Sequence, residues 1–86
     1  MPAVIEIYTK AFCPYCWRAK SLLEAKGLDY KEISVDYGGE AKQLMVRRAR
    51  GRTTVPQIFI GEVHVGGCDD LMALDRDGKL ESLFSA

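Results

Sequence analysis

The chain has 86 residues, of which 48% are hydrophobic and 28% are charged. This length accommodates one small domain, residues 1–86, and the composition is that of an ordinary soluble globular protein. Twelve basic residues balance twelve acidic ones, so the formal net charge is zero, which argues against a nucleic-acid or membrane-surface binder. No apolar run approaches the roughly 18–20 residues of a spanning helix. The N-terminus lacks the pattern of a signal peptide, so we expect a cytoplasmic protein with reduced thiols.

The first half of the chain predicts a strand, a helix and a second strand. Residues 3–8 (AVIEIY) are mainly β-branched and apolar and indicate a buried strand. From Pro14 onward, apolar residues recur at helical spacing up to Gly27, which is a typical helix stop. Residues 30–35 (YKEISV) alternate and predict a second strand. Such a strand–helix–strand unit is right-handed and pairs its two strands in parallel.

The second half predicts a helix, a hairpin and a last helix. Residues 38–51 read as a helix that stops at its final glycine, and residues 56–67 read as two short strands around a turn at Gly61 and Glu62. Residues 68–84 predict a helix that begins at the two aspartates after the cysteine and is interrupted near Gly78. The resulting order βαβαββα predicts an α/β fold, with a four-stranded mixed sheet and helices on both of its faces.

Two of the three cysteines lie in the segment CPYC, residues 13–16. Pro14 suits the first helical position, which places Cys13 at the N-cap and Cys16 in the first turn. The free N–H groups and the helix dipole favour a thiolate there, so the pKa of Cys13 is expected to fall, and Lys10 adds positive charge. Since the thiolate attacks disulfides, we expect Cys13 to be the nucleophile and Cys16 the resolving thiol. A CxxC motif beside a βαβ pattern is typical of thioredoxin-like redox proteins.

A zinc site is the alternative for these cysteines, with four candidate ligands: Cys13, Cys16, His64 and Cys68. Pro14 argues against it because it begins a helix, whereas structural zinc knuckles usually turn on small, flexible residues. His64 lies between two valines in a predicted strand, where alternation directs it away from them, so we expect an exposed strand histidine. We therefore expect no metal.

Three motifs occur in order: CPYC at residues 13–16, TVP at residues 54–56 and GGCD at residues 66–69. Together they resemble the motifs of the glutaredoxin family, close to the small bacterial dithiol glutaredoxins of the third type. They lie in the segments IYTKAFCPYCWRAKSLL and GRTTVPQIFIGEVHVGGCDDL, and the likeness covers nearly the whole chain. The resemblance implies a thioredoxin-like fold and a Cys13/Cys16 dithiol that uses glutathione to reduce protein–glutathione mixed disulfides and protein disulfides. Trp17 departs from the family, whose members often have a polar residue at that position.

The resemblance also implies a set of glutathione contacts: Lys10 and Gln43 for the glycine carboxylate, Tyr15 as a flanking ring, the cis-proline loop Thr54, Val55 and Pro56, and the loop Gly67, Cys68 and Asp69. A residue before proline is extended, and a cis bond at Val55–Pro56 would let the Val55 backbone pair with the ligand as an added strand. The N–H groups of Cys68 and Asp69 suit the γ-glutamyl carboxylate, and the Asp69 side chain suits the ammonium.

Each of these assignments has an ordinary structural alternative. Gln43 can be an exposed helix residue, Tyr15 a partly exposed aromatic, and Asp69 a helix cap. Pro56 can begin a strand with a trans bond. Cys68 is either a small residue beside the ligand loop or a regulatory thiol that is oxidised or glutathionylated.

Two functions remain open. The first is a glutathione-dependent oxidoreductase, a monomer whose partners are glutathione and disulfide-bearing or glutathionylated proteins, with ribonucleotide reductase implied by the family likeness. The second is a carrier in which two chains share a [2Fe–2S] cluster through Cys13 and glutathione. Pro14 stiffens the loop and Cys16 competes as a partner for Cys13, so the oxidoreductase is favoured.

Overall fold

A computed structural model describes residues 3–85. The elements occur in the order β1 (Ile5–Thr9), α1 (Pro14–Ala25), β2 (Lys31–Ser34), α2 (Gly39–Arg48), β3 (Gln57–Ile60), β4 (Val63–Gly66), α3 (Cys68–Arg76) and α4 (Leu80–Ser85). The predicted order is confirmed, and the interruption expected near Gly78 divides the last helix into α3 and α4. Gly78 has φ +72°, a left-handed conformation that suits glycine at the end of a helix. Within residues 3–85 no helix has the length and apolar character needed to cross a bilayer.

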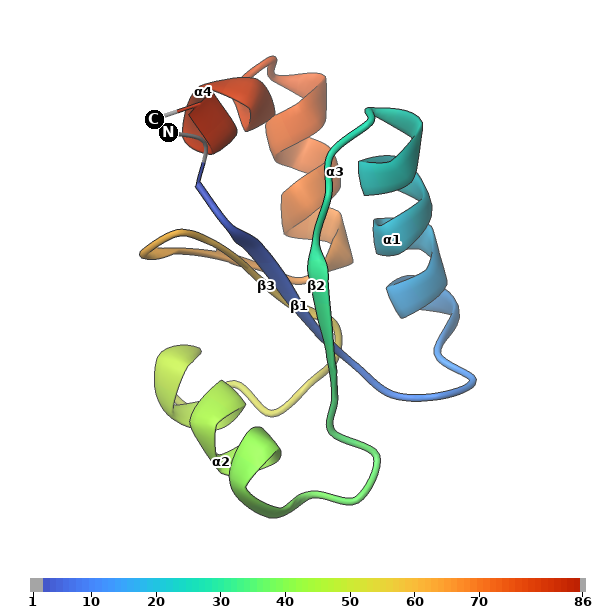
Figure 1. The fold of residues 1–86 in the computed structure, drawn as a ribbon, viewed down its shortest axis with the longest axis vertical. Helices are drawn as coiled ribbons and strands as arrows, with labels where there is room; N and C mark the ends of the chain where they lie inside the picture. The colour runs from blue at the N-terminus through green and yellow to red at the C-terminus, as the bar shows by residue number, and fades with distance from the viewer. Residues whose placement is uncertain (1–2, 86) are drawn as a thin grey trace.

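The four strands form one mixed sheet in the order β2-β1-β3-β4. β1 pairs in parallel with β2 and antiparallel with β3, and β3 pairs antiparallel with β4. Figure 1 shows α1 and α3 together on one side of this sheet and α2 on the other. The predicted four-stranded mixed sheet with helices on both faces is therefore confirmed.

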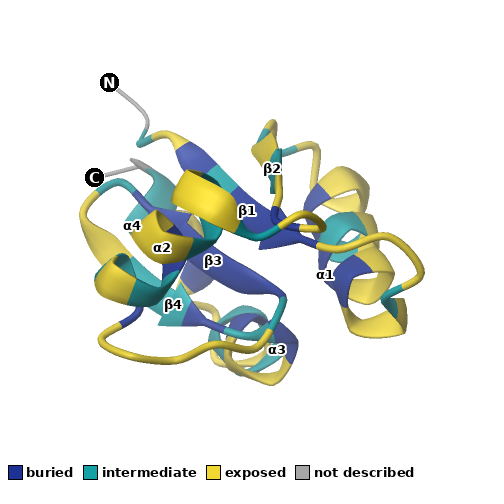
Figure 2. Cartoon of the chain, turned by 90° about the horizontal axis from the view of Figure 1, so that it is seen from below, coloured by how far each residue is buried: buried dark blue, intermediate teal, exposed yellow. Residues whose placement is uncertain are grey.

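Alternation along the two central strands divides the interior into two cores. Ile5, Ile7, Ile58 and Ile60 face α1 and α3, while Tyr8 and Phe59 face α2. On the first side they pack with Ala19, Leu23, Cys68, Leu71 and Leu80. On the second side they pack with Val35, Met45 and Ala49. Figure 2 shows that the buried positions follow β1 and β3 through the middle of the molecule.

The strand pairing brings three separate segments to one end of the sheet. Tyr8 of β1 lies opposite Gln57 of β3, so the end of β1, which leads to Cys13, lies beside the beginning of β3. Gly66 at the end of β4 lies opposite Ile58, so the entry into α3 reaches the same end. The antiparallel topology thus gathers the CPYC turn, the loop before β3 and the start of α3.

Candidate active site

The CPYC turn has the geometry expected of a helix N-terminus. Cys13 is the N-cap of α1 with φ −109° and ψ 104°, and Pro14 occupies the first helical position. The Cys16 main-chain N–H donates a hydrogen bond to Cys13 Sγ at 3.2 Å. An N–H directed at a sulfur in this way is complementary to a thiolate. The predicted placement of both cysteines is confirmed, and both are free thiols.

The two thiols differ in burial. Cys13 is half-buried, whereas Cys16 is fully buried. Burial raises the pKa of the Cys16 thiol to about 12, and its hydrogen bond with the Cys13 side chain acts in the same direction. Cys16 therefore stays protonated at neutral pH, and Cys13 is the member of the pair that an incoming disulfide can reach.

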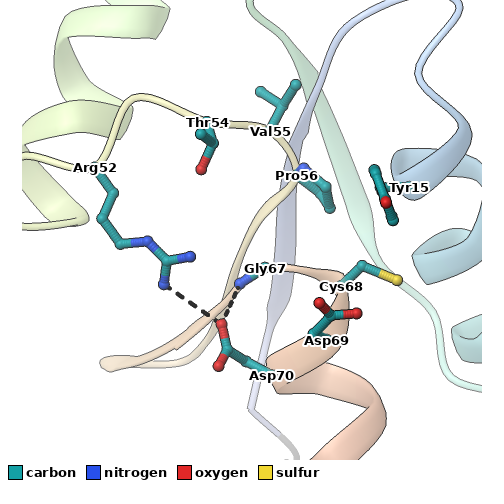
Figure 3. Close-up of a pocket in the computed structure, with 9 residues that line it drawn as sticks. All are labelled: Tyr15, Arg52, Thr54, Val55, Pro56, Gly67, Cys68, Asp69 and Asp70. Carbon is teal, nitrogen blue, oxygen red and sulfur yellow. Dashed lines mark hydrogen bonds and ion pairs between the residues drawn. The ribbon is translucent and has the colours of Figure 1, made fainter.

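A cleft of about 350 Å³ begins beside the dithiol at Tyr15, on the first turn of α1. Figure 3 shows the residues that line it: Tyr15, Arg52, Thr54, Val55, Pro56, Gly67, Cys68, Asp69 and Asp70. This volume lies within the roughly 300–1,000 Å³ of small-molecule sites. All of the lining residues except Arg52 and Asp70 belong to the contact set that the sequence resemblance implied. The tertiary structure therefore brings the two predicted ligand loops and the ring of Tyr15 into one cleft.

The loop before β3 forms one wall of this cleft. The Val55–Pro56 peptide bond is cis, as the resemblance implied. Within residues 3–85, no main-chain group outside this loop forms a hydrogen bond with the Val55 N–H or C=O. These two groups are therefore free to pair with an extended ligand.

The double glycine at the end of β4, Gly66 and Gly67, permits a close approach of charged side chains. Gly66 has φ +115°, and a Cβ there would lie 2.3 Å from Asp70 Oδ2 and 2.9 Å from Arg52 Nη1. Asp70 Oδ2 accepts a hydrogen bond from the Gly67 N–H at 2.9 Å and lies 3.4 Å from Arg52 Nη1. Any side chain at residue 66 would displace this pair.

These contacts correct the interpretation of the α3 N-terminus. The helix begins at Cys68 with Gly67 as its N-cap, not at the aspartates. The side chain that closes the cap is that of Asp70. The alternative in which Asp69 caps the helix is therefore wrong, and its carboxylate is exposed beside the cleft.

Lys10 and Gln43 do not line this cleft. Lys10 is exposed at the end of β1, close enough to Asp36 to help lower the pKa of that carboxyl. Gln43 lies on α2 in a separate surface groove with Val46 and Arg47. Their assignment to the glycine carboxylate of glutathione stays a prediction.

His64 is half-buried, so the expectation of an exposed strand histidine is wrong. Its ring stacks on Phe59 with centroids 4.9 Å apart, and its Nε2 lies 2.7 Å from Gln57 Oε1. The hairpin pairs His64 directly with Phe59, so its ring lies on the same face of the sheet as Phe59, the face that packs against α2. Among residues 3–85, no three His, Cys, Asp or Glu side chains converge as a metal-binding group.

Cys68 is buried, lines the cleft and belongs to the first core. Burial raises the pKa of its thiol, while Arg18 acts in the opposite direction. The protonated form is the less reactive one, so the environment is that of a structural cysteine.

Comparison with known proteins decides the family. The family model for glutaredoxin matches residues 5–65. The chain belongs to the glutaredoxin family. A glutaredoxin of Pseudomonas aeruginosa strain PAO1 is 60% identical over 86 residues, which cover 100% of both chains. Glutaredoxin 3 of Escherichia coli K12 is 54% identical over 82 residues, covering 95% of this chain and 98% of that protein. The predicted likeness to the third bacterial type is confirmed.

Solved glutaredoxins also share the fold. A crystal structure of a buckwheat glutaredoxin–glutathione complex superposes with a TM-score of 0.83 at 37% identity, covering 95% of this chain and 76% of that one. The thioredoxin-like fold is therefore confirmed, and the chain is a thiol–disulfide oxidoreductase of the glutaredoxin family.

The contact set that the resemblance implies lacks two side chains of this glutaredoxin cleft, Arg52 and Asp70. Asp70 had a usable signal, because an acidic residue three positions after a candidate N-cap is the spacing of a capping box. Arg52 is one of four neighbouring arginines, and no local pattern distinguishes it from Arg47 or Arg50.

Proposed function

We propose that this chain uses glutathione to reduce protein–glutathione mixed disulfides and protein disulfides through Cys13 and Cys16. The observation that carries the proposal is the cleft that runs from Tyr15, beside the dithiol, to the exposed carboxylate of Asp69. The glutathione complex of the buckwheat relative supports the same choice of ligand.

The charges in the cleft complement the γ-glutamyl end of glutathione, which carries a carboxylate and an ammonium on one carbon. The first N–H groups of α3, at Cys68 and Asp69, suit the carboxylate, and the Arg52 guanidinium adds a positive charge nearby. The Asp69 carboxylate suits the ammonium. The backbone of Val55 suits the cysteine residue of the ligand, which would lie as an added strand.

The proposed reaction on a mixed disulfide has two displacement steps. The Cys13 thiolate attacks the glutathione sulfur, the bond to the substrate protein breaks, and the protein leaves as a thiolate that takes up a proton. A second glutathione thiolate then attacks the sulfur of the bound glutathione, which releases glutathione disulfide and restores the Cys13 thiolate. Overall, the mixed disulfide and one free glutathione give the protein thiol and glutathione disulfide, and one half of that disulfide is the glutathionyl group removed from the substrate.

Reduction of a protein disulfide would use Cys16. Cys13 first forms a mixed disulfide with the substrate, and Cys16 then attacks Cys13 Sγ, which frees the substrate and leaves a Cys13–Cys16 disulfide. The Cys16 thiol has to lose its proton for this step. Part of the cause of its raised pKa is the Cys13 side chain, and that contribution ends when Cys13 becomes a neutral disulfide.

By family likeness, the proposed partners are glutathione and disulfide-bearing or glutathionylated proteins such as ribonucleotide reductase. We propose that the chain acts on them as a monomer in the cytoplasm.

An assay that couples glutathione reductase and NADPH to a small glutathione mixed disulfide tests the proposal. We expect NADPH oxidation that depends on the protein and on glutathione and saturates with the mixed disulfide. Activity that is independent of glutathione, or no activity with the fully reduced protein, would contradict it.

A further inference from the structure

A fully buried amide joins the cleft wall to β4. The Gln57 side chain has no solvent-accessible surface, and its Nε2 donates to the Thr54 main-chain carbonyl at 3.0 Å and to Thr54 Oγ1 at 3.2 Å. Its Oε1 lies 2.7 Å from His64 Nε2. A buried amide with partners at both ends is held in one orientation.

The direction of these hydrogen bonds follows from the chemistry of Thr54. Its carbonyl oxygen can only accept, so the Gln57 NH₂ group must face Thr54 and the Gln57 oxygen must face His64. His64 Nε2 must therefore carry a hydrogen and donate. Burial, and next the positive charge of Arg52, lower the pKa of His64, so the ring is neutral near pH 7 and its single N–H lies on Nε2.

The histidine is itself held in place. Its ring stacks on Phe59 with an interplanar angle of 22°, and the Arg48 guanidinium lies 4.1 Å from the centroid of the Phe59 ring. Arg48 in turn donates to Glu6 Oε1 at 2.9 Å. The Nε2–H group of His64 thus points at Gln57 from a ring with little freedom to turn.

Thr54 lies in the cleft wall immediately before Val55 (Figure 3). Gln57 is fully buried, and neither Gln57 nor His64 is among the residues that line the cleft. Since Thr54 Oγ1 accepts from Gln57, the hydroxyl proton is left to point elsewhere and can serve a ligand. We propose that Gln57 and His64 are positioning residues of the glutathione site: His64 orients the Gln57 amide, and this amide fixes Thr54 and the adjoining Val55 backbone. The inference rests on the glutathione-dependent function proposed above.

Two amide variants of His64 provide a matched test. His64→Gln places an N–H donor at about the position of Nε2, whereas His64→Asn places one near Nδ1, too far back to reach Gln57. Both variants lose the ring that stacks on Phe59, so they share any packing defect. In His64→Asn the buried Gln57 Oε1 loses its hydrogen-bond donor. We therefore expect the KM of this variant for a glutathione mixed disulfide to be about fivefold to tenfold above that of His64→Gln. The kcat values of the two variants should differ less than about twofold. Equal KM values for the two variants would overturn the proposal.

A second measurement needs no ligand and separates this inference from the proposed function. Long-range ¹H–¹⁵N NMR spectra of the unmodified protein should show the Nε2–H tautomer of His64. His64→Asn should shift the Thr54 and Val55 amide resonances, and His64→Gln should leave them near their original positions. A Nδ1–H tautomer, or unchanged Thr54 and Val55 resonances in His64→Asn, would overturn the positioning role even if glutathione turnover is normal. If the spectra show the hydrogen bonds from His64 through Gln57 to Thr54 but the protein does not use glutathione, the proposed function is wrong. The cleft that Gln57 and His64 position would then bind another ligand.

Discussion

The Asp36 side chain accepts a hydrogen bond from the Ala11 main-chain N–H at 2.8 Å, across 25 residues of sequence. Asp36 Oδ2 also accepts from the Ser34 hydroxyl at 2.8 Å. Ala11 precedes Phe12, which has φ +58° and a side chain that is 90% exposed. The turn after β2 is therefore attached to the strained turn that carries Cys13.

This contact predicts a pH-dependent contribution to stability. The Ala11 N–H, followed by Ser34 and Lys10, lowers the pKa of Asp36 in the folded protein. A carboxyl with a lowered folded-state pKa stabilises the protein above its unfolded-state value of about 3.9, and the contribution disappears as pH falls through the folded-state value. Asp36→Ala should therefore unfold at a lower temperature than the unmodified protein at pH 7. The difference should shrink as pH falls below the unfolded-state value of about 3.9 and through the lowered folded-state value, where the unmodified protein also loses the charge. A difference in Tm that is the same at both pH values would contradict this.

Cys13→Ser should abolish reduction of both mixed disulfides and protein disulfides, because a serine hydroxyl is not ionised near neutral pH. The fold should be retained, since Cys13 is half-buried and serine is a good N-cap residue. The coupled NADPH assay and a thermal unfolding curve check the two statements. Appreciable turnover by this variant would show that another thiol is the nucleophile.

Cys16→Ser should keep mixed-disulfide reduction and lose most protein-disulfide reduction, since glutathione itself can resolve the Cys13 adduct but the intramolecular step is gone. The two substrates have to be compared in the same preparation. Because Cys16 is fully buried, unfolding should be measured alongside activity. If the variant lost both activities with an unchanged Tm, Cys16 would have a role beyond resolving the mixed disulfide between Cys13 and the substrate protein.

Asp69→Asn should weaken glutathione use by about 1–2 kcal/mol, or roughly 5- to 30-fold in kcat/KM, because it removes the charge proposed to meet the ligand ammonium. Its Tm should stay nearly unchanged, since Asp69 is exposed and does not close the α3 cap.

Asp70→Asn is the matched control, because Asp70 makes the cap contact with Gly67 and the ion pair with Arg52. It should lower Tm more than Asp69→Asn does. Equal effects of the two changes on kcat/KM, with no difference in Tm, would contradict the separation of ligand contact from helix cap.

Local sequence determined the elements and the dithiol geometry. The placement of Cys13 at the N-cap depends only on Pro14, whose fixed φ suits the first helical position, and on the helix that follows. The strands around Gly61 and the helix break at Gly78 likewise follow from residues a few positions apart. The cis bond at Val55–Pro56 is different, because the residues alone allow either isomer and only the family resemblance implied it.

Tertiary structure decided how the site is completed. Arg52 and Asp70 are 18 positions apart and meet only because β4 returns beside β3 and the glycine at residue 66 leaves room for them. His64 meets Gln57 because β4 pairs His64 with Phe59, and alternation along β4 by itself does not show which face of the sheet α2 covers. Side-chain periodicity reports which face of an element is buried. Which distant side chains then meet depends on strand register and close backbone approach, and these exist only once the sheet has formed.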